Sequence, residues 1–281
     1  MLDTKSDIGT ETSGGSFLGD LGPPIRRYPY KGVTQLLHTL KTEKCRQQDD
    51  VDVSEWVNFT KFNNQAFTRD FLNSESMERR WNSYDSPEKL ILVKVLASHP
   101  HEAAARQFER LLFQSLQPMG LVSSLQTLGS ATCVAENGSA KQPDCQYLPL
   151  RLPKARTDKW PSLVVESDLS ESPSKLMSDA RFWLTGSNRE VQMVITIMIG
   201  RSTPEIVLES WELDNDSAKR TQVVIIGKGE NNHLYLRGQP LIIGFDKLFL
   251  RPPSIPRETD IIFDDDILKQ MATLVWVEQE S

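Results

Sequence analysis

Residues 191–200, VQMVITIMIG, form an almost uninterrupted apolar run. A strand with one solvated face alternates apolar and polar side chains, whereas a strand covered on both faces is apolar at odd and even positions alike. The run therefore predicts a central strand with protein layers on both sides. Because helices supply such layers in α/β proteins, this one segment already disfavours an all-helical chain and a sheet with one open face.

The segments around this run predict the rest of the layers. LILV at 90–93 and LVVE at 163–166 have the composition of strands, and EIVLESWEL, TQVVIIG and HLYLRG after residue 204 indicate further strands. The apolar spacing over 101–116, about 172–184 and 264–279 predicts helices. The order of these elements predicts an α/β fold with a mixed central sheet flanked by helices.

The domain organisation is expected to be simple. Residues 1–29 are rich in Gly, Ser, Thr and Asp, and we expect a disordered tail there. Residues 30–281 are expected to form a single α/β domain, with an N-terminal helical extension over 30–84 and the core over 85–281. Within the core, ATCVA at 131–135 and CQYLPL at 145–150 predict the two arms of a hairpin that turns near Asn137 and Gly138.

Charge, cysteine content and hydropathy restrict the functional class. The net charge of −6 is not typical of a dedicated nucleic-acid coat protein, although it allows a local phosphate-binding patch. Three cysteines without metal-ligand spacing fit reduced thiols. No apolar segment long enough for a signal peptide or a membrane span is visible, so we expect an intracellular protein, in cytoplasm or nucleus, with no membrane partner. The oligomeric state cannot be read from the sequence.

Two carboxylates stand at strand boundaries. Asp144 precedes the strand at 145–150, and Glu166 closes the apolar run that begins at Leu163. If these strands are neighbours, both carboxylates can meet at one margin of the sheet. Hard oxygen ligands of this kind suit Mg²⁺, which takes one or two protein carboxylates and keeps several waters. The alternative for Asp144 is a turn residue, whereas a carboxylate that closes an apolar run, as Glu166 does, needs a partner if it is buried.

The ordered set of motifs resembles the PD-(D/E)XK nuclease superfamily, which has the restriction-endonuclease-like fold. KQPDCQYLP at 141–149, WPSLVVES at 160–167 and FDKLFLRPP at 245–253 are similar to a group of uncharacterised fungal members, over roughly residues 84–281. The resemblance implies hydrolysis of phosphodiester bonds in DNA or RNA with Mg²⁺ or Mn²⁺. Asp144 and Glu166 would be both metal ligands and catalytic residues.

The superfamily motif carries a lysine two positions after the glutamate, where this chain has Asp168. Some members carry that lysine on the following helix, which makes Lys175 the candidate catalytic lysine. The alternative for Lys175 is a surface ion pair with Asp179, four positions later. Glu102, on the first helix of the core, matches an acidic residue that can contact the metal, and its alternative is an ion pair with Arg106.

Basic and imidazole side chains complete the candidate site. Lys154, Arg156 and Lys159 lie in a loop between the two carboxylates and are weak candidates for binding backbone phosphates; a solvated loop of mixed charge explains them almost as well. His101 could act as a general base, although a capping or exposed role is favoured.

Three functions remain open. The first is a metal-dependent nuclease, and the second is a catalytically inactive nuclease-fold protein that acts as a binding or regulatory module. Asp168 at the lysine position and the acidic pI favour the second. The third is an accessory protein without any nucleic-acid role. No phosphate-binding loop, dinucleotide-binding glycine motif or nucleophile elbow is present to support other chemistries.

Overall fold

The structure is a computed structural model that describes residues 17–19, 21, 25–49, 53–74, 77, 80–95, 99–169, 173–201, 203–229, 233–238 and 240–280. The described chain forms two compact units, which we treat separately. The residues predicted to bind a metal or to be catalytic lie in the first unit, which holds residues 100–129 and 144–280. The second unit holds residues 17–99 and 130–143.

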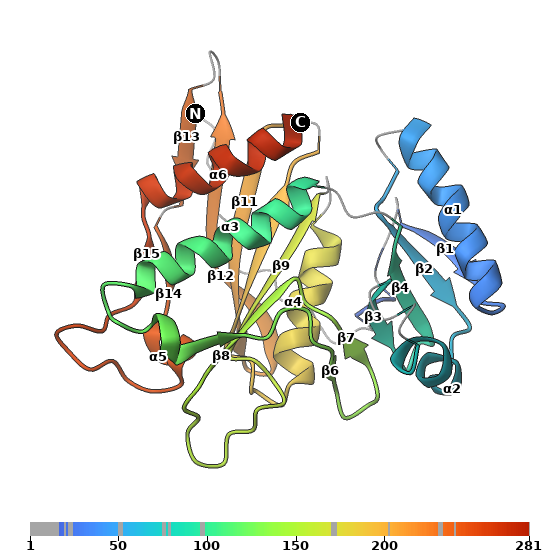
Figure 1. The fold of residues 1–281 in the computed structure, drawn as a ribbon, viewed down its shortest axis with the longest axis horizontal. Helices are drawn as coiled ribbons and strands as arrows, with labels where there is room; N and C mark the ends of the chain where they lie inside the picture. The colour runs from blue at the N-terminus through green and yellow to red at the C-terminus, as the bar shows by residue number, and fades with distance from the viewer. Residues whose placement is uncertain are drawn as a thin grey trace. The chain divides into compact units, whose positions relative to one another are not determined.

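The first unit is built on a mixed seven-stranded sheet (Figure 1). Its strands, in spatial order, are β13 (Leu234–Arg237), β12 (Ser217–Lys228), β11 (Glu205–Asp214), β10 (Met193–Ile199), β9 (Leu163–Leu169), β8 (Cys145–Pro149) and β5 (Leu125–Thr127). Only β9 and β10 pair in parallel, and the other neighbours pair antiparallel. The predicted α/β class with a mixed sheet flanked by helices is therefore confirmed.

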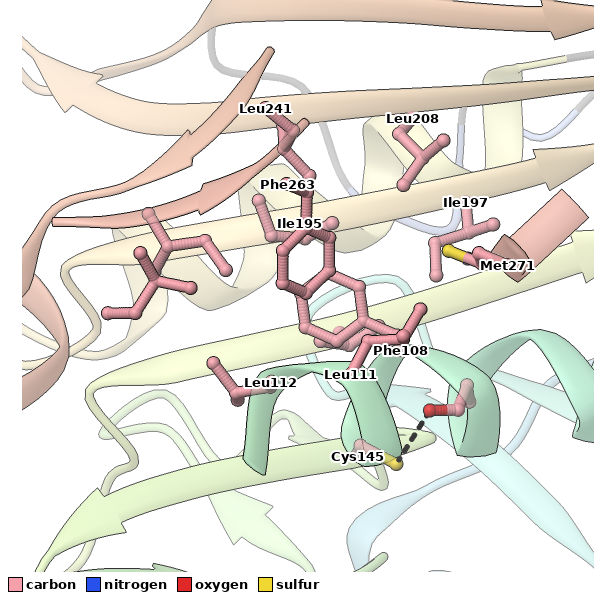
Figure 2. Packing of buried hydrophobic residues seen from close by; sticks show 14 of the residues in the cluster. Phe108, Leu111, Leu112, Cys145, Ile195, Ile197, Leu208, Leu241, Phe263 and Met271 are labelled. Atoms are coloured by element: carbon pink, nitrogen blue, oxygen red, sulfur yellow. Dashed lines mark hydrogen bonds between the residues drawn. The ribbon is translucent and has the colours of Figure 1, made fainter. Parts of the chain in front are cut away.

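The apolar run of residues 191–200 contains β10, a strand near the middle of this sheet. Ile195 and Ile197 face a core layer that α3 (His99–Leu116) and α6 (Asp265–Glu280) cover. Figure 2 shows Phe108 of α3, Met271 of α6 and Phe263 packed around these two isoleucines. The prediction of a central strand with burial on both faces is confirmed, because Val194 on the opposite face is also fully buried.

The opposite face of the sheet is covered by α4 (Ser174–Gly186), which contacts β9, β10, β11 and β12 (Figure 1). This helix is the crossover that joins the parallel strands β9 and β10, as a parallel connection requires. Side chains alternate along a strand, so Leu163 and Val165 of β9 enter the first core layer and Glu166 points to the α4 side. This alternation places the candidate acid of β9 beneath α4.

Smaller elements close one end of the first unit. They are η2 (Val122–Ser124), β14 (Leu241–Ile243), α5 (Phe245–Phe249) and β15 (Ile261–Phe263), with β14 and β15 paired antiparallel. The α6 helix begins at Asp265, close to the predicted start. The side chain of Asp264 caps it by accepting a hydrogen bond from the backbone N–H of Ile267 (3.0 Å).

The second unit has its own six-stranded sheet. Its strands, in spatial order, are β1 (Arg26–Pro29), β2 (Trp56–Thr60), β4 (Leu90–Lys94), β3 (Trp81–Asp85), β7 (Ala140–Lys141) and β6 (Cys133–Val134). The helical elements are α1 (Val33–Asp49), α2 (Asn64–Phe67) and the π-helical segment η1 (Thr68–Leu72). Leu36 and Leu40 of α1 pack on aromatic residues of this sheet, which include Phe59 and Tyr84.

Three expectations differ from this arrangement. Residues 30–84 contain β2 and β3 as well as helices, and residues 26–29 of the expected disordered tail form β1, while most of the tail lies outside the described residues. The predicted hairpin between 131–135 and 145–150 is wrong: β6 pairs with β7 around Gly138, whose φ of 82° fits the turn, whereas β8 pairs with β5 and β9. The single-domain boundaries remain a prediction.

Candidate active site

Lys175 lies in the first turn of α4, and its side chain is buried between the helix and the sheet. Its Nζ donates a hydrogen bond to Oδ2 of Asp179 (2.7 Å), one helical turn later. The predicted i, i+4 pair therefore exists, but both partners are almost completely buried and not solvated. A charged pair in such an environment needs further stabilising contacts.

The electrostatic environment of Lys175 is strongly acidic. Burial alone would lower the pKa of its ammonium group, but four carboxylates raise the pKa well above its ordinary value. In order of their effect they are Asp179, Asp168, Glu166 and Asp144. Lys175 is therefore a cation at all physiological pH values, and it is close enough to both acids of the motif to interact with them.

Glu166 lies within β9 and is fully buried. The strand continues for three residues beyond it in register with β10, so the expectation that Glu166 closes the strand is wrong. Its Oε1 accepts a hydrogen bond from Nε1 of Trp183 on α4 (2.6 Å). The indole fixes the orientation of the carboxylate, and the pairing on β10 fixes the backbone beneath it.

Asp144 immediately precedes β8, and the antiparallel register of Cys145 with Val165 brings it beside Glu166 and Ser167. Its Oδ2 accepts a hydrogen bond from the backbone N–H of Ser167 (2.7 Å) and lies 2.9 Å from the Ser167 hydroxyl. Its Oδ1 accepts from Nε2 of His101 (3.2 Å). Glu166 therefore lies in β9, and Asp144 lies directly before the neighbouring strand β8.

The role of His101 was missed by the sequence analysis, which favoured a capping or exposed imidazole. The residue is 1% exposed and lies in the first turn of α3, with its carbonyl 3.1 Å from the hydroxyl of Ser167. A ligand-type nitrogen of His101 and a carboxylate oxygen of Asp168 lie within 4.8 Å of each other. The HPHEAAARQF segment carried the only sequence signal, a histidine at the start of the core helix.

The other candidates lie at exposed positions or in the loop after β8. Glu102 is exposed on α3. Lys154 and Lys159 are exposed in the loop that joins the end of β8 to the start of β9, which is the end of that hairpin away from Asp144. Nη2 of Arg156 donates to the carbonyl oxygen of Trp160 (2.8 Å), at the end of the same loop, and to that of Glu190 (2.9 Å), between α4 and β10. In an antiparallel hairpin the connecting loop lies at one end and the free strand ends lie at the other. The 150–162 loop is therefore far from Asp144, although it lies between the two acids in the sequence.

The side chains of this group suit a divalent cation. Asp144, Glu166 and Asp168 offer carboxylate oxygens, which Mg²⁺ and Mn²⁺ prefer, and His101 offers an imidazole nitrogen, which Mn²⁺ and Zn²⁺ also accept. Among Lys175 and its four carboxylates, negative charges exceed positive charges by three. A cation bound here would offset part of that excess.

The same contacts argue against a serine nucleophile. In a Ser-His-Asp triad the imidazole lies beside the serine hydroxyl, and the carboxylate lies behind the imidazole. Here the carboxylate of Asp144 lies between Ser167 and the imidazole of His101. The group is arranged for holding charge and not for acyl transfer.

Comparisons with known proteins add little beyond this geometry. No family model and no curated protein matches the chain. One similar solved structure is described as a "putative nuclease belonging to DUF820" from Anabaena variabilis ATCC 29413, with a TM-score of 0.38 and 12% sequence identity. The similarity covers 69% of this chain and 90% of that chain. A TM-score this low does not bear on function. In the part of the chain that is described, none of the helices is both long and apolar enough to span a membrane.

Proposed function

We propose that the first unit is a restriction-endonuclease-like domain of the PD-(D/E)XK superfamily that hydrolyses phosphodiester bonds of DNA or RNA with Mg²⁺ or Mn²⁺. The observation that supports this most is the position of Lys175, a lysine on the helix after the acid-bearing strand that interacts with Asp144 and Glu166. The motif of the superfamily needs an ammonium group beside two carboxylates, and a helix can supply it in place of the strand.

Each residue has a defined part in this proposal. Asp144 and Glu166 hold the cation, while Trp183 and Ser167 orient these two carboxylates through the hydrogen bonds described above. A bound divalent cation supplies a water ligand of lowered pKa and offsets charge on the phosphodiester oxygens. Lys175 orients the attacking water, and Asp168 and His101 are candidates to complete the ligand set. Glu102, exposed on α3, is at most an outer ligand.

The test is cleavage of single-stranded and double-stranded DNA and RNA with Mg²⁺, Mn²⁺ or EDTA. We expect metal-dependent cleavage by the wild-type protein and a loss of at least about 100-fold in Glu166→Gln, since metal ligation contributes several kcal/mol to phosphoryl-transfer transition states. Glutamine keeps an oxygen that can accept from Trp183, so the variant should fold. Glu278→Gln, an exposed site on α6, is the matched control. Equal rates in wild type and Glu166→Gln would refute the assignment.

A second candidate is a catalytically inactive domain that uses the same fold for binding or regulation. One structural observation favours it: both oxygens of Asp144 already accept hydrogen bonds, from His101 and from Ser167. Calorimetric titration with Mg²⁺ and with Mn²⁺ separates the two functions. A nuclease should bind in the millimolar range or tighter and lose that binding in Asp144→Asn, whereas an inactive domain should show no such site.

Nucleic acid is the partner that this proposal implies. Lys154 and Lys159, exposed in the loop between β8 and β9, are the candidates for backbone phosphate contacts away from the acids. We propose an intracellular location, in cytoplasm or nucleus.

A further inference from the structure

The first unit contains a second candidate site, at the other end of β8 from Asp144. A cavity of about 370 Å³ opens there beside Pro149, the last residue of the strand. Five residues of strand separate the two ends by about 17 Å. The cavity volume falls at the lower end of the range of small-molecule pockets, about 300–1,000 Å³.

One side of this cavity is apolar and held in place from several elements. Leu121 and Phe249 are buried, and Leu150 continues the apolar wall toward solvent. The backbone N–H of Leu150 donates to the carbonyl of Ser124 (3.0 Å), and the α5 helix is tied to the sheet by the Ser162 hydroxyl, which donates to the carbonyl of Leu248 (2.7 Å). The wall is therefore formed before any ligand arrives.

The polar side chains of the cavity are all hydrogen-bond donors. They are the guanidinium groups of Arg151 and Arg251 and the hydroxyl groups of Ser123 and Ser124. Among the described residues that line the cavity, none is acidic, although Glu258 is paired with the lining Arg251. Neither serine hydroxyl, nor the guanidinium of Arg151, is hydrogen-bonded or ion-paired with any residue that the structure describes. Two guanidinium groups, which can only donate, and two hydroxyl groups, which can also donate, are complementary to an anion.

Arg251 is fixed in position by its surroundings. Its guanidinium makes two hydrogen bonds to the carboxylate of Glu258 (2.6 and 2.8 Å) and lies over the rings of Phe245 and Phe249, 5.0 and 5.9 Å from their centres. Glu258 neutralises part of its charge, so Arg151 supplies the larger uncompensated positive charge. A guanidinium group held in place beside an exposed one is a suitable arrangement for recognising a tetrahedral anion.

We propose that this cavity binds a small phosphate monoester whose organic part is flat and apolar. Its three terminal oxygens would accept from the guanidinium of Arg151, from the N–H groups of Arg251 that Glu258 and Pro252 leave open and from the two hydroxyl groups, whereas a carboxylate offers one oxygen fewer. Its organic part would lie on Phe249 and the neighbouring leucines, where ring contacts favour a planar group. This site does not depend on the proposed nuclease activity, because it shares no residue with the acidic group.

The test is calorimetric titration of the full chain with phenyl phosphate. We expect saturable binding at one site with a Kd below about 1 mM. Inorganic phosphate, benzyl alcohol and benzoate should each bind at least about tenfold more weakly, because each lacks either the apolar part or the third oxygen. An equal affinity for any of the three, or binding of a single-stranded oligonucleotide without binding of phenyl phosphate, would overturn the proposal.

Single substitutions test whether phenyl phosphate binds in this cavity. Arg151→Gln should weaken phenyl phosphate binding about tenfold, the effect of one lost charge-assisted contact of about 1.4 kcal/mol. Arg110→Gln, which removes the same charge from an exposed position on α3, should leave the affinity unchanged. Both sites are exposed, so neither change should affect folding. Unchanged affinity in Arg151→Gln would exclude the cavity, and Glu166→Gln, which tests the nuclease, should bind phenyl phosphate as the wild type does.

Discussion

Lys175 and Asp179 form an ion pair in which both side chains are almost completely withdrawn from solvent. Transfer of such charges from water is costly, and their mutual attraction offsets that cost only while both are present. Exposed pairs behave differently, because water screens them and either partner can be solvated alone. The stability of the first unit should therefore depend on Lys175 far more than on an exposed lysine of the same spacing.

We expect Lys175→Met to lower the free energy of unfolding by about 3–5 kcal/mol, because it leaves Asp179 buried without its counter-charge. The double variant Lys175→Met with Asp179→Leu should recover only part of that loss, because Asp168, Glu166 and Asp144 also lose the cation that they interact with. Urea denaturation followed by circular dichroism measures both changes.

The control for this comparison is Lys219→Met, which removes one partner of the pair with Asp214, where the side chains are 40% and 49% exposed. It should change the free energy of unfolding by less than about 1 kcal/mol. If Lys175→Met behaves like this control, the pair is not buried in solution.

The sequence was informative about single residues only where local spacing carried the information. The apolar spacing over about 172–184 predicted a helix that contains Lys175, and the structure has that helix as α4. Spacing could not show that Lys175 is buried, since that depends on how α4 packs on β9 to β12. It also could not show that His101 meets Asp144, because the contact joins residues 43 positions apart through the packing of α3.

Among the elements, β10 bears most on the stability of the first unit. It pairs with β9 on one side and with β11 on the other, and its side chains are buried on both faces. Ile195→Ala should lower the free energy of unfolding by about 2–5 kcal/mol, the usual effect of a cavity in a packed core. Ile262→Ala in β15, where the side chain is 50% exposed, should change it by less than about 1 kcal/mol.

Chemical denaturation of the two variants under identical conditions checks this prediction. Equal destabilisation by both changes would mean that β10 is not enclosed by α3 and α6 on one side and α4 on the other.

The predicted elements differ in how far they could be read from the chain. Strong local patterns gave β10, α3 and α6, because their apolar periodicity records burial directly. The predicted hairpin failed because β7 and β8 are three residues apart in sequence yet belong to different sheets. Alternation predicts a strand but not its partner, and the partner is chosen by contacts that are distant in sequence.

Both units contribute a buried thiol, and this affects the stability of the protein at high pH. Burial raises the pKa of Cys133 to about 12, and burial together with nearby Glu109 and Asp144 raises that of Cys145 to about 12, from an ordinary value of 9.0. Between pH 9 and pH 12 the thiols of the unfolded chain are deprotonated, whereas the same thiols in the folded chain keep their protons. The stability from each thiol is therefore fully present below pH 9 and is lost as the pH rises toward 12.

We expect the free energy of unfolding to fall above pH 9 with a limiting slope of about 1.4 kcal/mol per pH unit for each buried thiol. Urea denaturation at pH 7.5, 9 and 10 measures this decline. Buried or hydrogen-bonded tyrosines with a raised pKa, such as Tyr28 and Tyr147, add to it near pH 10, so the thiol contribution is taken from the difference between the wild type and the cysteine variants. Cys145→Ala should reduce the slope of this decline by the contribution of one thiol. Cys45→Ala, at an exposed position, should leave it unchanged, and an identical pH dependence in both variants would contradict the burial of Cys145.

The enclosure of Glu166 within a paired strand has a consequence for how this protein can vary. Successive side chains of β9 point to opposite faces of the sheet, and the register with β10 places Thr196 opposite Glu166. One residue inserted between Leu163 and Glu166 would move the Glu166 side chain to the apolar face of the sheet, under α3 and α6. A valine side chain would then face Lys175. Lineages that retain the acid should therefore tolerate length changes in the 150–162 loop but none within the strand.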